Sequence, residues 1–208
     1  VCAWMEDTDD VRVLVVAGAP PNPPLEGKRA KPHAFVAGAD ITEFAGAGST
    51  VIRERFRNNA VEALWNLSKP TIAMVDGFAL GGGSEIALSC DLRVATPRSK
   101  FGTPEINLGL IPGYGGTQRL VSLLGYGKAL EMVYTGEMIN AGEAFRIGLV
   151  NHVVESSELK QKALDMACLI ATKSSNTLRV AKETLRSALD EGLTEGVATE
   201  ARAFAGLF

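Results

Sequence analysis

The chain has 208 residues, with 46% hydrophobic side chains, 22% charged side chains and a formal net charge of −3. This length and apolar content suffice for one domain with a full core, or for one domain with a smaller appendage. The balanced charge without a dense Lys/Arg run argues against nucleic acid as a partner, and no apolar run reaches the about 18 residues that a membrane span needs.

The first part of the chain alternates between strand, loop and helix patterns. Residues 11–18 form a short β-branched run that ends in glycine, which predicts a buried strand. Residues 20–31 are polar and broken by prolines, which predicts a surface loop, and residues 34–41 predict a strand end that runs into a turn. Apolar side chains at helical spacing then predict one helix over residues 51–67, which Pro70 must stop.

The middle of the chain repeats this order with shorter elements. Residues 71–75 predict a buried strand, residues 77–83 a glycine loop and residues 84–89 a short, largely apolar helix. Another strand is predicted at residues 92–95. Because strand, glycine loop, short helix and strand recur, we expect an α/β domain whose sheets are covered by helices.

The last part of the chain is mostly helical in pattern. Three helices are predicted, over residues 117–124, 128–134 and 141–147. Gly125 is expected to cap the first of them, and a strand is predicted at residues 149–154. From about residue 156 the apolar residues keep helical spacing, which predicts a helical C-terminal portion.

Two glycine turns and two glutamates are the strongest candidates for a chemical site. The turns lie at residues 37–40 and 81–83, and each can aim a backbone N–H group at one point, as an oxyanion hole requires. Glu85 falls in the first turn of the short helix, and Glu105 lies among apolar residues where burial should disturb its pKa. Ordinary tight turns, a helix-capping acid and a structural salt bridge are the alternative interpretations of these residues.

Other kinds of site find little support in the sequence. His33 and His152 are the only histidines and neither has ligand spacing, so no metal site is expected. The three cysteines, at positions 2, 90 and 168, lack the spacing of a zinc site or a disulfide scaffold and fit a reducing compartment. The sequence also lacks the G-x-S-x-G nucleophile elbow, the P-loop and the dinucleotide fingerprint.

Four motifs follow one another along the chain: AFVAGADITE at residues 34–43, KPTIAMVDGFALGGGSEIALSCD at residues 69–91, FGTPE at residues 101–105 and GLIPGYGGTQRL at residues 109–120. In this order they resemble the crotonase superfamily of acyl-CoA enzymes, and among them enoyl-CoA hydratases most closely. The resemblance implies a ββα spiral core, here residues 1–155, and a helical region used in trimer assembly, here residues 156–208. Because the family pattern extends beyond Val1 and Phe208, we expect the sequence to be partial or abridged at both ends.

The resemblance also implies roles for individual positions. The N–H groups of Ala39 and Gly82 would form the oxyanion hole for the thioester carbonyl. Glu85 would be the main partner in activating a water, Glu105 would donate a proton to the α-carbon, and Gly113 would lie beside the reacting water. The implied contacts with the acyl-CoA substrate are Ala37, Ala39, Asp40, Ile41, Thr42 and Gly82.

The function that the resemblance implies is a reversible 2-enoyl-CoA hydratase of fatty-acid β-oxidation. It would need no metal or redox cofactor, since coenzyme A is part of the substrate, and it would assemble as a homotrimer or a dimer of trimers. The expected location is the cytoplasm, or the mitochondrial matrix if a targeting segment is missing. The alternatives are a Δ3,Δ2-enoyl-CoA isomerase, a non-catalytic acyl-CoA-binding or assembly module, and an acyl-CoA hydrolase or dehalogenase with Asp40 as the nearest conspicuous acid.

Overall fold

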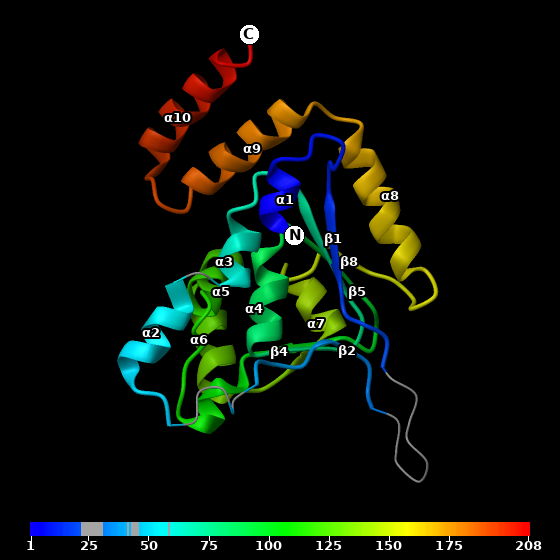
Figure 1. Cartoon of the computed structure of the whole chain (residues 1–208), viewed down its shortest axis with the longest axis vertical. Helices are drawn as coiled ribbons and strands as arrows, with labels where there is room; N and C mark the ends of the chain where they lie inside the picture. Colours follow the sequence, from blue (N-terminus) through cyan, green and yellow to red (C-terminus); the bar gives the residue numbers. More distant parts are fainter. Residues whose placement is uncertain (22–30, 41, 43–45, 58) are drawn as a thin grey trace.

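The computed structural model describes residues 1–21, 31–40, 42, 46–57 and 59–208 (Figure 1). Ile41 and most of the loop predicted at residues 20–31 lie outside these described residues. The described helices are α1 (Cys2–Glu6), α2 (Ser49–Arg57), α3 (Ala60–Trp65), α4 (Gly82–Ser89), α5 (Gly116–Leu124), α6 (Tyr126–Thr135), α7 (Ala141–Arg146), α8 (Leu159–Ala171), α9 (Ser175–Ser187) and α10 (Leu193–Ala205), with a 3-10 helix at Pro104–Leu108.

The described strands form two four-stranded sheets, with the strand orders β1-β3-β5-β8 and β2-β4-β6-β7. Their bounds are β1 (Leu14–Ala17), β2 (Ala34–Val36), β3 (Thr71–Val75), β4 (Phe78–Leu80), β5 (Leu92–Ala95), β6 (Lys100–Gly102), β7 (Ile139–Asn140) and β8 (His152–Val153). Neighbouring strands are parallel except β6 and β7, which are antiparallel. From β1 to β6 consecutive strands alternate between the sheets, so each ββ unit adds one strand to each sheet. This arrangement confirms the predicted α/β fold with a ββα spiral core.

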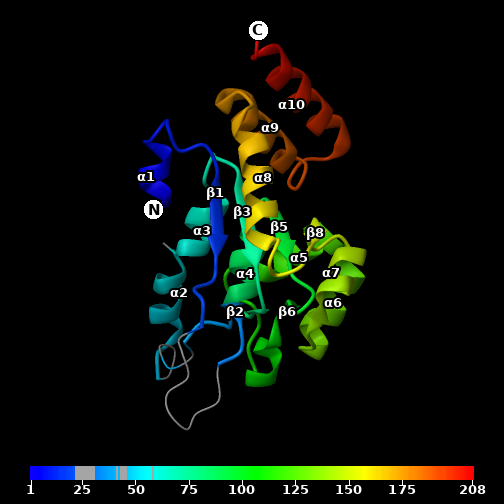
Figure 2. The same cartoon turned by 90° about the vertical axis from the view of Figure 1, so that its right-hand side faces the viewer.

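The sheet β1-β3-β5-β8 is covered on both faces. Along β3, Ala73 and Val75 belong to the main core, which also contains side chains of α4, whereas Ile72 packs with Leu159 and Ala163 of α8. Figure 2 shows α8 crossing β1, β3 and β5 on one face of this sheet, and Figure 1 shows α4 on its other side. Burial on both faces explains why β1 and β3 read as continuous apolar runs rather than as alternating ones.

The helix predicted over residues 51–67 is two helices in the structure, α2 and α3. Asn59 separates them, and its side-chain oxygen accepts hydrogen bonds from the N–H groups of Val61 and Glu62, each at 2.9 Å. Its extended backbone, with φ −101° and ψ 158°, is that of an N-cap residue and cannot continue a helix. The apolar residues on the two sides of the break serve different places: Val61 and Leu64 of α3 are buried, whereas Ile52 and Phe56 of α2 line a cavity.

The sequence pattern also missed α1, the 3-10 helix at Pro104–Leu108 and several short strands. The glycine loop predicted at residues 77–83 contains β4, and α4 begins at Gly82 rather than at Ser84. Strands β6 and β7 were not predicted, and the strand predicted at residues 149–154 is confined to β8. Strands of two or three residues are too short to show an alternating pattern, so only their pairing with longer neighbours identifies them.

The C-terminal portion is helical, as predicted. Helix α8 packs on the sheet, whereas α9 and α10 contact each other and lie beyond the ends of the strands, at the top of Figure 1. Lys182 and Arg186 of α9 form ion pairs with the carboxylate of Asp91, with N···O distances of 2.8 and 3.1 Å, and these pairs attach α9 to the core. The division of the chain after residue 155 stays a prediction.

Among the described helices, none combines the length and the apolar character that crossing a membrane requires.

Gly83 is the position where α4 approaches β2 most closely. A Cβ atom at this residue would lie 1.9 Å from the carbonyl oxygen of Val36, so Gly83→Ala should force α4 and β2 apart. We expect a loss of about 3 kcal/mol of unfolding free energy, the upper range for overpacking. Gly196→Ala in α10 is the matched control, because nothing lies within 4 Å of its Cβ position and alanine is the better helix former. Equal urea midpoints for the two variants would contradict the close contact.

Candidate active site

The candidate site surrounds the start of α4, where the chain leaves β4 through Gly81. Gly81 adopts the left-handed φ of 54° that favours glycine, and its N–H donates to the carbonyl of Gly102 at 3.0 Å. Helix α4 then begins at Gly82, so the first N–H groups of this helix have no partner within it. The helix dipole adds positive potential at the same place.

Ala39 lies beside Gly82 at this helix start. A Cβ atom at Gly82 would lie 3.7 Å from both the backbone nitrogen and the Cβ of Ala39. The structure thus brings together the two residues whose N–H groups the sequence motifs assign to an oxyanion hole, although they lie on different turns of the chain. Their role in holding a developing negative charge stays a prediction.

Glu85 lies in the first turn of α4 and is only 1% exposed. Its Oε1 atom accepts two backbone hydrogen bonds, from the N–H of Tyr114 at 2.7 Å and from the N–H of Gly116 at 2.8 Å. A Cβ atom at Gly116 would lie 2.8 Å from that same oxygen, so only glycine permits this approach. The carboxyl group is therefore clamped from the loop that precedes α5.

Glu105 comes to the same place from the 3-10 helix Pro104–Leu108. A Cβ atom at Gly81 would lie 3.1 Å from Glu105 Oε1, which places this carboxyl group next to the start of α4. Its other oxygen, Oε2, is buried and accepts no hydrogen bond from the described residues. A buried carboxyl oxygen without a donor favours the protonated form of the acid.

The surroundings of the two carboxyl groups act differently on their pKa values. Burial raises the pKa of Glu105 above its usual value. Burial also raises the pKa of Glu85, and the charge of Glu105 adds to that rise, but the N–H groups of Gly116 and Tyr114 and the positive Arg119 oppose it. Among the described residues, two N–H groups of another segment donate to Glu85, whereas only the N–H of Glu105 itself opposes the rise in the pKa of Glu105. The contacts thus stabilise a negative charge on Glu85 better than one on Glu105, as a base beside an acid requires.

Both glutamates line a cavity of about 490 Å³. Its other lining residues are mainly small or apolar: Ala37, Gly38, Ala39, Ala47, Ile52, Phe56, Gly81, Gly82, Pro104, Leu108, Leu110, Ile111, Gly113 and Tyr114. Gly113, which the motifs place beside the reacting water, is part of this wall, and a Cβ there would lie 2.7 Å from the ring of Phe56. An apolar cavity with a few convergent polar groups is typical of a small-molecule site.

Asp40 and Thr42 lie outside the lining of this cavity. Asp40 is exposed, and its Oδ1 accepts hydrogen bonds from the N–H and the hydroxyl of Thr42, at 2.9 and 2.6 Å. These bonds hold the pKa of Asp40 below its usual value, and their geometry is that of an aspartate that stabilises a turn. Ile41, the remaining predicted contact of this turn, lies outside the described residues. The structure thus gives Asp40 a local structural partner and no place beside Glu85 and Glu105.

The residues that the sequence analysis missed are the partners of Glu85 and the apolar wall. Tyr114 and Gly116 act through backbone N–H groups, which no side-chain pattern reveals. Phe56 enters from α2, and the exposed Leu110 and Ile111 follow the 3-10 helix. The one signal of this wall in the sequence is the apolar pair Leu110 and Ile111, which lies in a loop between Gly109 and Pro112. Among the described residues, no group of three His, Cys, Asp or Glu could hold a metal ion.

Comparison with known proteins gives consistent matches. The family model described as enoyl-CoA hydratase/isomerase matches residues 25–208. A short-chain-enoyl-CoA hydratase of Clostridium acetobutylicum is 40% identical over 211 residues, which cover all of this chain and 76% of that protein. A crotonyl-CoA hydratase of Syntrophomonas wolfei is 43% identical over 181 residues, which cover 82% of this chain and 66% of that protein. The crystal structure of enoyl-CoA hydratase subunit I from Geobacillus kaustophilus superposes with a TM-score of 0.90 at 39% identity, over all of this chain and 76% of that one.

Proposed function

The chain belongs to the enoyl-CoA hydratase/isomerase family, and we infer that it is an enoyl-CoA hydratase, which adds water reversibly across the 2,3 double bond of a 2-enoyl-CoA thioester to give 3-hydroxyacyl-CoA. The observation that carries this inference is the pair of carboxyl groups, Glu85 and Glu105, in one apolar cavity at the start of α4. Water addition needs one group to take a proton from water and another to deliver a proton to carbon. A base and acid pair at one place meets that need.

The proposed role of the α4 start is to hold the thioester carbonyl oxygen. As hydroxide adds to the β-carbon, the electrons of the double bond move onto that oxygen and form an enolate. The N–H groups of Ala39 and Gly82 would stabilise this charge, together with the dipole of α4. The adjacency of the two residues supports this assignment.

The proposed proton transfers follow from the two environments. The ionised Glu85 takes a proton from water while the water oxygen bonds to the β-carbon. The protonated Glu105 then delivers its proton to the α-carbon, which restores the thioester carbonyl. One proton must pass from Glu85 back to Glu105 before the next turnover. The overall reaction adds one water and exchanges no electrons, so it needs no redox cofactor, and the coenzyme A moiety belongs to the substrate.

The presence of both acids favours the proposed function over its alternatives. An isomerase that moves the double bond needs one acid to carry a proton from the γ-carbon to the α-carbon. A binding module needs neither acid, and a hydrolase that forms an acyl intermediate needs a nucleophile in the cavity, where Asp40 does not lie. Water addition is the reaction that uses Glu85 and Glu105 together.

We further propose that the protein assembles as a homotrimer or a dimer of trimers. Large apolar side chains exposed on and next to α9 and α10 support an interface there: Leu185, Leu189, Leu193, Val197, Phe204 and Phe208. The proposed pathway is β-oxidation. Its proposed location is the cytoplasm, because the two hydratases compared above come from bacteria. The mitochondrial matrix is the alternative, since a relative of Dictyostelium discoideum is named as mitochondrial.

The proposed function is tested by adding the protein to crotonyl-CoA and following the ultraviolet absorbance of the conjugated thioester. Hydration should remove this absorbance, and Glu85→Gln should slow the loss about 100-fold or more, because the amide cannot take a proton from water. Glu200→Gln is the control, since this exposed side chain lies on α10. Constant absorbance with a folded protein would refute the hydratase, and a gain of absorbance with a 3-enoyl-CoA would then identify an isomerase.

A further inference from the structure

Arg119 of α5 is a buried charge that does not line the candidate active site. It is 7% exposed and is absent from the lining of the cavity that holds Glu85 and Glu105. One guanidinium nitrogen donates to the carbonyl of Tyr114 at 2.6 Å, and another pairs with Glu62 of α3 at 2.9 Å. The guanidinium also lies over the ring of Trp65, 4.6 Å from the ring centroid. Its contacts therefore join α3 to the loop before α5.

That loop is the one that clamps Glu85. The carbonyl held by Arg119 belongs to the peptide between Tyr114 and Gly115. The peptides on either side of it supply the two N–H groups that donate to Glu85 Oε1. Arg119 thus holds the central peptide of three, and the outer two hold the carboxylate.

Gly115 lets the two N–H groups converge on one oxygen. Its φ of 87° is left-handed, and it lies so close to the guanidinium that a Cβ there would be 2.4 Å from a nitrogen of Arg119. The loop is therefore bent around Arg119 and packed directly against it. A shift of this side chain would move the peptides that bind Glu85.

We propose that Arg119 is a positioning residue of the hydration reaction, which fixes the loop at residues 113–116 so that Glu85 is held ionised and in place to activate water. The proposal rests on the proposed function, and it assigns Arg119 no contact with the substrate. A displacement of about 1 Å at a reacting group is enough to slow a reaction about 100-fold. The guanidinium suits this role because it is flat and presents several donors in fixed directions, which a lysine cannot do.

In the part of the chain that the structure describes, few charged groups lie near Glu85, so the effect of Arg119 on its titration can be isolated. The described elements packed most extensively against α4 are β2, β4, α3 and α5. Strands β2 and β4 carry no titratable side chain, α3 contributes Glu62, which is paired with Arg119, and α5 contributes Arg119 itself. Among the described residues, Glu105 is the other charged neighbour that acts on Glu85.

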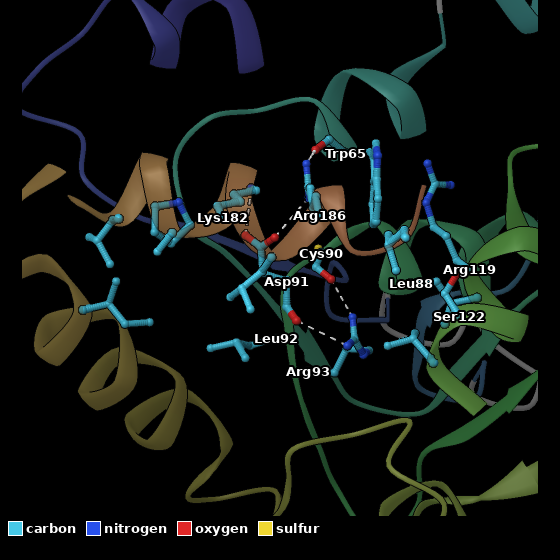
Figure 3. A pocket seen from close by; sticks show the side chains of 17 residues that line it. Trp65, Leu88, Cys90, Asp91, Leu92, Arg93, Arg119, Ser122, Lys182 and Arg186 are labelled. Carbon is cyan, nitrogen blue, oxygen red and sulfur yellow. Dashed lines mark hydrogen bonds and ion pairs between the residues drawn. The ribbon is translucent and has the colours of Figure 1, made fainter. Parts of the chain in front are cut away.

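A second arginine provides a matched control. Figure 3 shows Trp65 between Arg119 and Arg186, and the guanidinium of Arg186 lies 3.9 Å from the ring centroid. Arg186 also pairs with Asp91 at 3.1 Å and donates to the carbonyl of Trp65, and among the described residues none of its hydrogen bonds reaches the loop that clamps Glu85. Loss of either arginine removes a guanidinium from the same tryptophan, whereas only loss of Arg119 releases the carbonyl of Tyr114.

The test compares Arg119→Met, Arg119→Lys and Arg186→Met with the wild-type protein. Arg119→Met should lower kcat for crotonyl-CoA about 100-fold, with KM changed less than about threefold. Without the positive charge and the fixed N–H groups, the pKa of Glu85 should rise, so the acid limb of the kcat profile should move to higher pH. Arg119→Lys should fall between Arg119→Met and wild type, and Arg186→Met should keep the wild-type acid limb. The titration of Glu85, followed by carboxyl ¹³C NMR and assigned with Glu85→Gln, should show the same order.

The possible results separate this proposal from the proposed function. Wild-type kcat and an unmoved acid limb in Arg119→Met would overturn the positioning role and leave the hydratase intact. Equal losses in Arg119→Met and Arg186→Met, with no shift in the Glu85 titration, would overturn it too, because they indicate general damage. If Arg119→Met does not fold, Arg119→Lys decides, and wild-type kcat in that variant contradicts the proposal. If the wild-type protein hydrates nothing, the proposed function fails, and the Glu85 titration still decides the role of Arg119.

Discussion

Glu105→Gln is expected to lower kcat for crotonyl-CoA hydration about 1000-fold, within the range that general acid catalysis contributes. The amide has nearly the same shape but cannot deliver a proton to the α-carbon. Burial raises the pKa of Glu105, so the wild-type acid keeps its proton to a higher pH than a solvated glutamate. Because the donor is lost as the pH rises through that pKa, the basic limb of the wild-type kcat profile should be absent from the residual activity of the variant.

The fold should be unaffected by this change, and that expectation separates chemistry from damage. Glu105 Oε2 is buried and makes no hydrogen bond to the described residues, so the substitution breaks no bond at that atom. Urea unfolding of Glu105→Gln should therefore give a midpoint at or above that of the wild-type protein, since the amide is neutral at every pH, whereas the glutamate must bind a proton to be buried without charge. Retention of more than about a tenth of the wild-type kcat would show that another group donates the proton.

Gly82→Pro is expected to lower kcat about 100- to 1000-fold, which is the usual effect of removing one donor from an oxyanion hole. Proline lacks the backbone N–H group, and Gly82 is the first residue of α4, where proline is well tolerated by a helix. The far-ultraviolet circular dichroism of the variant should therefore match that of the wild-type protein. Steady-state kinetics with crotonyl-CoA would show the loss mainly in kcat.

Gly82→Ala controls for the added volume. A Cβ at this position would meet its nearest neighbours, in Ala39, at 3.7 Å, an ordinary contact, and the N–H group is kept. This variant should retain most of the wild-type kcat. If alanine and proline reduce kcat to the same extent, the effect comes from crowding of the cavity, and the N–H group of Gly82 is not the donor.

Much of the fold could be predicted because the relevant signals are local. The largely apolar run at residues 71–75 lies within one strand, and burial on both faces is what makes it continuous. Asn59 shows the limit of such signals, since the apolar stripe of residues 51–67 crosses a helix break that only the backbone conformation reveals. The shortest strands were missed for a similar reason, because they are defined by their partners.

The sequence by itself determined which chemical groups this protein carries: three glycines that open α4, with Glu85 behind them and Glu105 two strands later. Only the tertiary structure decided what those groups can do. The N–H donors of Glu85 come from residues 29 and 31 positions away, and the pair of Arg119 with Glu62 joins residues 57 positions apart. The spacing of apolar residues indicates which side of a single helix or strand is buried. Hydrogen bonds and charges between distant segments depend on how the elements pack, and they set the protonation of Glu85 and Glu105.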